Sequence, residues 1–301
     1  MGQTVACANQ KGGVGKTTTV VNLATYLALA GDRVLVVDLD PQGNATSGLG
    51  IERSALERSI YEALLDGVPV HDLVVRGPVD RLEVVPSALP LAGAEVELAG
   101  VERRERRLAD ALSPLDGRYQ YVFIDCPPSL GLLTINALTA ADSVLVPIQC
   151  EYYALEGLSQ LVATVNLVRE HLNPNLELKG VVMTMFDART NLASEVVAEV
   201  RRHLGPAVLS TIVPRSVRLA EAPSHGVPIA LYRPESAGAE AYRRLAVELR
   251  ARDGRPLQAT ESAPPLPLAD ATIGGEVRGG RNESMIAASP GRSVPVQAGD
   301  R

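Results

Sequence analysis

Short runs of apolar, largely β-branched residues alternate along the chain with longer segments whose apolar residues recur every three or four positions. The short runs are apolar almost throughout, which is typical of parallel strands covered on both faces. They predict strands at residues 4–8, 33–38, 82–86, 121–125, 143–149, 178–185 and 208–213. The longer segments predict helices at residues 17–30, 101–112, 130–139, 155–172, 194–204 and 239–252. Alternation of strand and helix predicts a doubly wound α/β fold with a mainly parallel sheet flanked by helices.

The composition of the chain changes after about residue 253. The following segment contains Pro and Gly clusters, such as residues 263–267 and 274–275, and shows no apolar periodicity. Sequences of this kind bury too little apolar surface to offset the entropy of ordering the chain. We therefore expect one folded domain, residues 1–253, followed by a flexible Gly- and Pro-rich tail, residues 254–301.

Cysteine usage and hydropathy indicate a cytoplasmic protein. Cys7, Cys126 and Cys150 are odd in number and show no CxxC spacing, which favours reduced thiols over a disulfide framework or a zinc site. No apolar run approaches the ~18 residues that a membrane-spanning helix requires. An export signal is also not recognisable. We expect no membrane partner.

Charge is distributed unevenly along the sequence. The whole chain carries a formal net charge of −6. Residues 181–252, in contrast, contain 10 arginines and 7 acidic residues, a net charge of +3. A basic face that meets nucleic acid and a helical surface with many ion pairs both explain such an excess. Composition alone leaves these two interpretations open.

The strongest signal is the heptapeptide Lys-Gly-Gly-Val-Gly-Lys-Thr at residues 11–17, between the first predicted strand and the first predicted helix. Its glycines allow a tight turn that directs backbone N–H groups at phosphate oxygens, and the helix N-terminus adds partial positive charge. Lys16 is placed to reach the β- and γ-phosphates, and the Thr17 hydroxyl to bind Mg²⁺. The pattern therefore predicts a site for ATP and Mg²⁺. Its nucleotide-binding candidates are Lys11, Gly12, Gly13, Val14, Gly15, Lys16, Thr17 and Thr18.

The loop departs from the usual phosphate-loop pattern, because Gln10 stands where a glycine is expected and Lys11 follows it. A lysine at this position can reach the phosphates of a partner subunit, as an arginine finger supplied in trans does. In this respect the chain resembles the deviant Walker A ATPases, which include ParA/Soj, MinD, the nitrogenase iron protein and the arsenite-pump ATPases. The resemblance implies an ATP-dependent sandwich dimer, with Lys11 and Lys16 among the catalytic residues.

Two aspartates at the ends of apolar runs are candidates to act beside the phosphates. Asp40 follows the predicted strand at residues 33–38, and in the family the matching residue positions the attacking water near Mg²⁺. Asp-Pro sequences also favour turns, so a turn-capping role for Asp40 remains open. Asp125 ends a Walker B pattern, in which the carboxylate holds a water of the Mg²⁺ shell. We expect Thr17, Asp40 and Asp125 to form the metal site, partly through water.

Three longer blocks resemble the ParA/Soj branch of the family, within a similarity that runs from about residue 3 to 252. They lie at residues 38–47, 149–157 and 217–226. The first predicted strand begins at once, so the chain is similar to the short chromosomal Soj type, without the helix-turn-helix domain of larger ParA proteins. The tail offers no amphipathic membrane helix of the MinD kind. Cys126 lacks a second thiolate at cluster spacing, so we expect a small buried residue and not an iron–sulfur ligand.

The resemblance to Soj also implies a DNA-binding surface. In Soj-like proteins, arginines on the outer face of the dimer bind the backbone of double-stranded DNA without sequence preference. The matching candidates here are Arg189, Arg215 and Arg218. An ordinary surface ion pair is the alternative for each of them.

One of these arginines has a second candidate role. Pro214 and Ser216 lie in a stretch that resembles the segment closing over the nucleotide base in the family, so they are further nucleotide-binding candidates. Arg215 lies between them and fits either the DNA or the nucleotide role.

Together these resemblances imply a cytoplasmic, nucleoid-associated ATPase that hydrolyses ATP to ADP and phosphate, weakly when alone. The ATP-bound homodimer would bind nucleoid DNA non-specifically, and a ParB-type centromere-binding protein would stimulate hydrolysis, which drives chromosome or plasmid partitioning. The rival interpretation is a ParA-like scaffold that positions a non-DNA cargo through another adaptor. The sequence does not distinguish chromosome, plasmid and other cargo.

Overall fold

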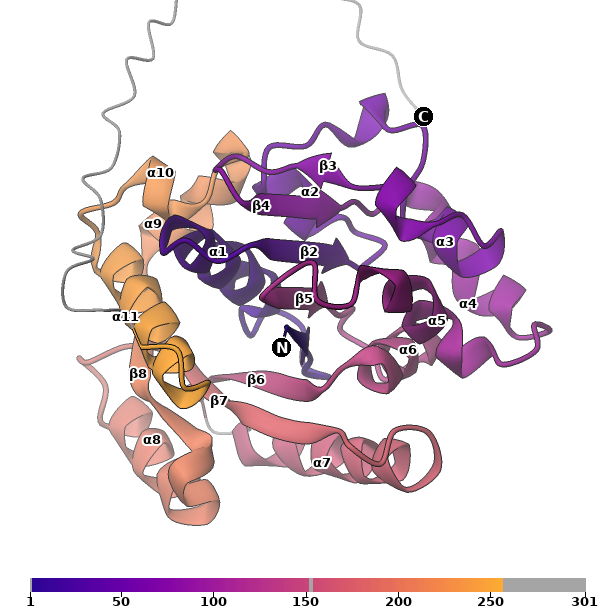
Figure 1. The fold of residues 1–301 in the computed structure, drawn as a ribbon. Helices are drawn as coiled ribbons and strands as arrows, with labels where there is room; N and C mark the ends of the chain where they lie inside the picture. The colour runs from indigo at the N-terminus through magenta and orange to yellow at the C-terminus, as the bar shows by residue number, and fades with distance from the viewer. Residues whose placement is uncertain (1, 152–153, 257–301) are drawn as a thin grey trace, which may run out of the picture. The chain divides into compact units, whose positions relative to one another are not determined.

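A single sheet runs through the part of the chain that the computed structural model describes, residues 2–151 and 154–256 (Figure 1). Eight strands follow the order β3-β4-β2-β5-β1-β6-β7-β8, and every neighbouring pair is parallel except β3 with β4. The strands are β1 Gln3–Cys7, β2 Val34–Asp38, β3 Val75–Arg76, β4 Leu82–Val85, β5 Tyr121–Asp125, β6 Ser143–Gln149, β7 Glu177–Phe186 and β8 Val208–Pro214. The predicted fold class, a doubly wound and mainly parallel sheet, is confirmed.

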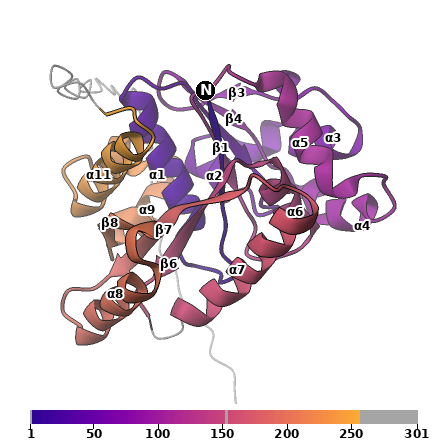
Figure 2. The ribbon, with the colours of Figure 1, turned by 60° about the horizontal axis from the view of Figure 1, so that its bottom comes forward.

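Helices cover both faces of this sheet (Figure 2). One layer contains α1, α2, α9, α10 and α11, and the other contains α3 to α8. The helices are α1 Lys16–Leu29, α2 Asn44–Gly48, α3 Ile60–Leu65, α4 Ala94–Leu98, α5 Arg107–Leu112, α6 Leu132–Ala140, α7 Ala154–His171, α8 Asn191–Leu204, α9 Val217–Glu221, α10 Ile229–Tyr232 and α11 Ala237–Arg252.

Two apolar cores, one on each side of the sheet, hold these layers together. Successive strand residues point to opposite faces, so Val34 and Val36 enter the core beneath α1 and α11, whereas Leu35 and Val37 enter the core beneath α3 to α8. The four β2 side chains are fully buried. Strands that are covered on both sides have no polar face, which explains their continuous apolar runs in the sequence.

The predicted elements agree with the structure most closely where they are buried. The predicted strands at residues 121–125 and 143–149 match β5 and β6 residue for residue. The helix predicted at residues 101–112 is shorter, because Arg103 has a positive φ of 53° and α5 starts only at Arg107. Among the residues described, no helix has the length and apolar character needed to cross a bilayer.

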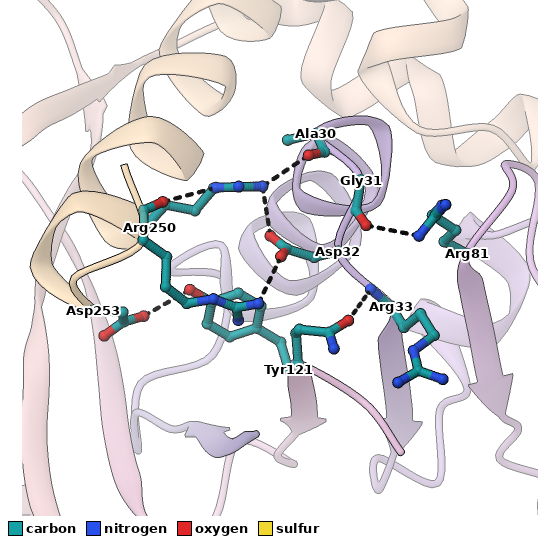
Figure 3. A network of polar contacts seen from close by, with 10 residues as sticks. Ala30, Gly31, Asp32, Arg33, Arg81, Tyr121, Arg250 and Asp253 are labelled. Carbon is teal, nitrogen blue, oxygen red and sulfur yellow. Dashed lines mark hydrogen bonds and ion pairs between the residues drawn. The ribbon is translucent and has the colours of Figure 1, made fainter. Parts of the chain in front are cut away.

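The end of α11 is fastened to the amino-terminal edge of the sheet by a group of polar contacts (Figure 3). The buried Asp32 carboxylate accepts a 2.9 Å hydrogen bond from Arg250 and forms a 3.2 Å ion pair with Arg255. Asp253 accepts a 2.7 Å hydrogen bond from the Tyr121 hydroxyl and pairs with Lys179. These contacts are paired and largely buried, so removing one partner leaves a buried charge uncompensated.

This arrangement bears on the domain boundary predicted at residues 253 and 254. Arg255 lies beyond that boundary, yet it contacts Asp32 and its guanidinium lies 5.5 Å from the centre of the Tyr121 ring. The ordered contacts therefore extend at least to residue 255. The rest of the predicted tail, from residue 257, lies outside the described residues.

We predict that a chain ending at residue 256 keeps the thermal stability of the full chain, whereas a chain ending at residue 253 loses it in part. The shorter chain lacks the ion pair between Arg255 and buried Asp32, which should lower the free energy of unfolding by about 1–2 kcal/mol. Urea unfolding of both chains measures the difference. Arg255→Ala in the chain ending at residue 256 should reproduce it, and equal stability of all three chains would contradict this role for Arg255.

Candidate functional site

A glycine-rich loop connects the carboxyl end of β1 to the start of α1. Gly13 and Gly15 have φ values of 76° and 89°, in the left-handed region that residues with a side chain rarely adopt. Gly15 forms the N-cap of α1 without any side-chain cap. The first amides of a helix have no partner within it, so this loop presents backbone N–H groups to a ligand at the helix N-terminus.

Two side chains outside the predicted site hold the loop in position. The Thr184 hydroxyl, from β7, donates a 2.8 Å hydrogen bond to the carbonyl of Val14. Asn9 accepts a 3.0 Å bond from the Lys11 amide and donates a 2.7 Å bond to the Pro147 carbonyl of β6. The loop is thereby fastened to two strands beyond its own. The contact between Thr184 and the loop spans 170 positions, so no local pattern predicts it.

The two lysines of the loop have different environments. Lys16 is buried, and its ammonium donates a 3.3 Å hydrogen bond to the Lys11 carbonyl, so its charge lies inside the turn. The Lys11 side chain is 40% exposed and forms a 2.9 Å ion pair with Glu151, just beyond the end of β6. Lys16 therefore belongs to the interior of the loop, whereas Lys11 lies at its rim, paired within its own chain.

Acidic residues meet this loop at the carboxyl ends of β2 and β5. The two strands are neighbours, and their register places Asp38 directly beside Asp125. The Thr17 hydroxyl donates a 2.7 Å hydrogen bond to one oxygen of Asp125. Asp38 accepts bonds from the Thr46 amide at 2.7 Å and the Thr46 hydroxyl at 2.6 Å. The structure thus brings two of the candidate metal residues, Thr17 and Asp125, into contact, and it adds Asp38, to which the sequence analysis gave no role.

Asp40 lies two residues beyond the end of β2 and is also buried. One of its carboxylate oxygens accepts a 2.9 Å bond from the Gln42 amide, and its carbonyl accepts a bond from the Ser87 hydroxyl. The turn-capping contact that the sequence analysis considered for Asp40 is therefore present, as the bond from the Gln42 amide. It occupies one carboxylate oxygen and does not exclude a second role for the other.

Burial dominates the electrostatics of these carboxylates. It raises the pKa of Asp38 to about 6, although the hydrogen bonds from Thr46 act in the opposite direction. The pKa of Asp125 is also raised, first by burial and then by the nearby charge of Asp38. Burial likewise raises the pKa of the neighbouring Cys126 thiol, which contacts the Ile124 carbonyl, so Cys126 is a small buried residue, as expected. Without a bound cation, the site therefore disfavours the ionised forms of Asp38 and Asp125.

The geometry fits a hydrated Mg²⁺ ion better than a metal held by protein groups alone. Among the described residues, no group of three or more His, Cys, Asp or Glu side chains is arranged to hold a metal. One oxygen of Asp125, however, is buried without a hydrogen-bond partner, while the other accepts from Thr17. Mg²⁺ prefers oxygen ligands and keeps several waters, so a hydroxyl, a carboxylate and phosphate oxygens suit it. A divalent cation would also offset the raised pKa of Asp125.

A cavity of about 390 Å³ adjoins the loop and contains several of the predicted nucleotide-binding residues. Gly15 and Thr18 line it at the start of α1, and Pro214, Arg215 and Ser216 line it from the end of β8. The structure thus brings together loop and base-closing candidates that are about 200 positions apart in the sequence. The remaining lining residues are Thr184, Met185, Val213, Val217, Leu219, Ala220 and Tyr242.

Tyr242 was missed by the sequence analysis and contributes a buried contact to this cavity. Its hydroxyl lies 3.2 Å from the Thr19 hydroxyl of α1. The two residues are 223 positions apart, so no spacing rule connects them. Met185, another lining residue, has a positive φ of 52°, which is unusual for a residue with a long side chain.

The other candidate arginines lie on the surface. Arg189 is 87% exposed and binds Asp187 through two nitrogens, at 2.8 and 2.6 Å, which holds the pKa of Asp187 well below its usual range. Arg218 forms a 2.7 Å ion pair with Glu221 in α9. Both ion pairs are local and exposed, as in the alternative interpretation. Pairs of this kind contribute little to stability and exchange readily with another anion.

Comparisons with known proteins identify the family. A family model described as an AAA domain matches residues 2–178. The "Sporulation initiation inhibitor protein Soj" of Bacillus subtilis (strain 168) is 58% identical over 251 residues, which cover 83% of this chain and 99% of the relative. The "Chromosome partitioning protein ParA" of Myxococcus xanthus (strain DK1622) is 56% identical over 253 residues, or 84% of this chain and 89% of the relative.

A solved structure agrees with the fold. Cobyrinic acid a,c-diamide synthase from Mycobacterium smegmatis, crystallised with ADP and magnesium, is 41% identical with a TM-score of 0.73, over 85% of this chain and 98% of that chain. The bound nucleotide and metal are properties of that protein. Its similarity supports the P-loop NTPase architecture of this chain.

We predict that Asp38 makes the stability of the metal-free protein depend on pH. A carboxyl whose folded pKa of about 6 exceeds its unfolded value stabilises the fold fully below about pH 4, and this contribution is lost as the pH rises through 6. Between those limits the wild type should lose about 3 kcal/mol of unfolding free energy relative to Asp38→Asn, which stays neutral.

Urea unfolding in EDTA at a series of pH values measures this difference. The readout is its change with pH, because the amide also loses hydrogen bonds at every pH. Asp116→Asn, at an exposed position, is the matched control and should run parallel to the wild type. A parallel curve for Asp38→Asn as well would show that Asp38 is not the titrating group.

Proposed function

Because the chain belongs to the Soj/ParA family of chromosome-partitioning ATPases, we propose that it is an ATP-operated switch that dimerises and binds nucleoid DNA without sequence preference. In this proposal a ParB-type partner stimulates ATP hydrolysis, which returns the protein to its DNA-free state. The observation that carries the proposal is the glycine-rich loop at residues 11–17, which contains both lysines. Its Thr17 contacts Asp125, and its Gly15 lines the neighbouring cavity.

The chain's own residues suit ATP and Mg²⁺ in complementary ways. The loop amides and the buried ammonium of Lys16 would bind the phosphates, and Thr17 and Asp125 would hold the metal, directly and through water. Pro214 and Ser216 would close over the base in the adjoining cavity. Bound Mg²⁺ would supply positive charge beside the phosphates.

Hydrolysis requires a group that orients the attacking water. Asp40 is buried beside Asp38, and one of its carboxylate oxygens is left after the bond from Gln42. We assign that oxygen to the water, which it would hold by a hydrogen bond in line with the phosphate. The turn contact and the catalytic contact would thus use different oxygens of one side chain.

Lys11 connects the nucleotide to dimerisation. Its ammonium lies at the rim of the loop, paired with Glu151 across an exposed surface. An exposed ion pair contributes about 0–1 kcal/mol, so it would exchange easily for the phosphates of a second subunit. Dimerisation would then require ATP, because the phosphates are the partner that replaces Glu151.

The arginines proposed to bind DNA are Arg189 and Arg218, with Arg215 able to serve DNA or nucleotide. All three are exposed, and two of them are held by acids within four positions. A phosphate backbone would replace those acids and would be contacted regardless of base sequence. The arginine excess in residues 181–252 supports this assignment.

We predict that Lys16→Ala lowers ATP affinity by about 100-fold or more, because the loop loses its buried ammonium and hydrogen bonds to charged groups are the strong ones. Isothermal calorimetry measures the affinity. Lys11→Ala is the matched control: it should bind ATP nearly as well as the wild type but fail to dimerise in size-exclusion chromatography. Equal ATP affinity of the wild type and Lys16→Ala would reject the phosphate-loop assignment.

Asp40→Ala and Asp40→Asn should both bind ATP and hydrolyse it at least about 100-fold more slowly, because neither retains the carboxylate that orients the water. The pair separates the two roles of Asp40. The amide of Asp40→Asn can still accept the Gln42 bond, so only Asp40→Ala should lose thermal stability. If Asp40→Asn hydrolyses ATP at the normal rate, Asp40 serves the turn alone.

Arg189→Glu and Arg218→Glu should each weaken binding of the ATP-bound dimer to unrelated duplexes alike. Each phosphate that is no longer neutralised should reduce the slope of log affinity against log salt by about 0.9. Fluorescence anisotropy over a salt series measures both quantities. Arg202→Glu is the control, because Arg202 is exposed in the same basic region and pairs with Glu199 in its own helix. If all three variants showed the same slope of log affinity against log salt, the weaker DNA binding would result from the change in net charge alone.

A further inference from the structure

A second basic feature lies at the amino ends of the strands, whereas the nucleotide loop lies at their carboxyl ends. Arg33, Arg81 and Arg118 come one to three positions before β2, β4 and β5, which are neighbouring parallel strands. The amino ends of these strands therefore gather three arginines from separate parts of the sequence. Arg76 joins them from β3, whose register pairs it with Glu83 of β4.

These four arginines line a groove of about 690 Å³, which we call the arginine groove. Its two acidic residues are Asp80 and Glu83. Glu83 is already engaged, because it accepts a hydrogen bond from the Tyr119 hydroxyl and lies 3.6 Å from Arg118. The acids are fewer than the arginines, so the groove is positive although the whole chain is negative.

The arginines of the groove differ in what they bind within the chain. Within the described residues, Arg33 and Arg76 have no carboxylate partner for their side chains, and Arg81 donates only to the neutral carbonyl of Gly31, at 3.0 Å. Figure 3 shows Arg33 and Arg81 beside the contacts of Asp32. There the neighbouring Arg250 is neutralised by a buried acid. The groove thus has guanidinium groups that the described part of the protein leaves without an acidic partner.

We propose that the arginine groove binds the phosphate groups of an anionic ligand. Guanidinium groups match phosphate oxygens with two parallel hydrogen bonds, and four of them around one groove suit a ligand with more than one phosphate. Two of the apolar residues that line the groove, Leu82 and Tyr119, are buried and offer little surface to a peptide. Contacts to a phosphate backbone require only charge and hydrogen-bond donors.

The source of the phosphate is either the DNA backbone or a small phosphate ion. If the ligand is DNA, the groove would be a second site of contact with the duplex. It would lie at the amino ends of the strands, away from the cavity at their carboxyl ends that Pro214 and Ser216 line. The groove does not depend on the DNA-binding arginines proposed above. Both can therefore be tested separately in one protein.

The test uses the full chain carrying Arg189→Glu and Arg218→Glu, saturated with a non-hydrolysable ATP analogue and Mg²⁺ so that the loop is filled and the protein stays in its ATP-bound state. In this background, Arg33→Gln together with Arg76→Gln should weaken binding to an unrelated duplex and reduce the salt slope by about 0.9 for each phosphate that is no longer neutralised. The matched control is Arg58→Gln with Arg169→Gln, which changes the net charge equally at two exposed positions outside the groove. Circular dichroism checks that both double variants fold.

Three probes distinguish the ligands: the duplex, inorganic phosphate and poly-glutamate, each followed by the arginine Nε–H signals in NMR spectra. Shifts of the Arg33 and Arg76 signals by the duplex identify the DNA backbone, and shifts by inorganic phosphate alone identify a small ion. Poly-glutamate acting as strongly as the duplex would overturn the proposal in favour of an acidic protein partner. No shift of the Arg33 and Arg76 signals with any probe would also overturn it, whatever the dimer with intact Arg189 and Arg218 does on DNA. Equally weakened duplex binding in the groove and control variants would exclude the DNA backbone as the ligand.

Discussion

The burial of two neighbouring carboxylates is the constraint on which the rest of the site depends. Asp38 and Asp125 end adjacent parallel strands in register, and both side chains are fully buried. Two carboxyl groups that lie side by side in a poorly solvated environment cannot both stay ionised unless nearby groups compensate their charge. The hydroxyl groups of Thr17 and Thr46 and the ammonium of Lys16 supply part of it, and the raised pKa values indicate that it is incomplete.

Because the negative charge of these carboxylates is only partly compensated, the position of the neighbouring loop matters, and several hydrogen bonds hold it in place. A loop next to buried acids must hold its lysine and its amides in fixed directions, and bonds from Thr184 and Asn9 fasten it to β7 and β6. These bonds reach strands outside the β1–α1 unit, so the phosphate site is a property of the whole sheet. In the function proposed here, the missing positive charge arrives with Mg²⁺, so metal binding relieves an electrostatic imbalance already present in the fold.

The parts of this arrangement that were predictable from sequence are the local ones. Buried strands such as β5 carry their pattern in consecutive residues, and the loop joins its glycines to Lys16 and Thr17 within seven positions. Contacts between distant segments have no such pattern: the pair formed by Thr19 and Tyr242 depends on how α11 packs against α1. The ordered contacts also extend beyond the predicted domain boundary, since Arg255 pairs with the buried Asp32. A boundary based on composition cannot detect the contact of one arginine.

The packing of α1 against α11 limits where conformational change can occur. The hydroxyls of Thr19 and Tyr242 meet near the loop, and Arg250 binds the Ala30 carbonyl and Asp32 at the far end of α1. The two helices are therefore tied at both ends, and sliding one along the other would break a buried ion pair, which is costly. Movement that follows nucleotide binding is easier in the exposed segments after β7 and β8. The segment after β8 borders the cavity and contains Arg215 and Arg218, so a shift of this segment would affect both the nucleotide and the DNA in the proposed function.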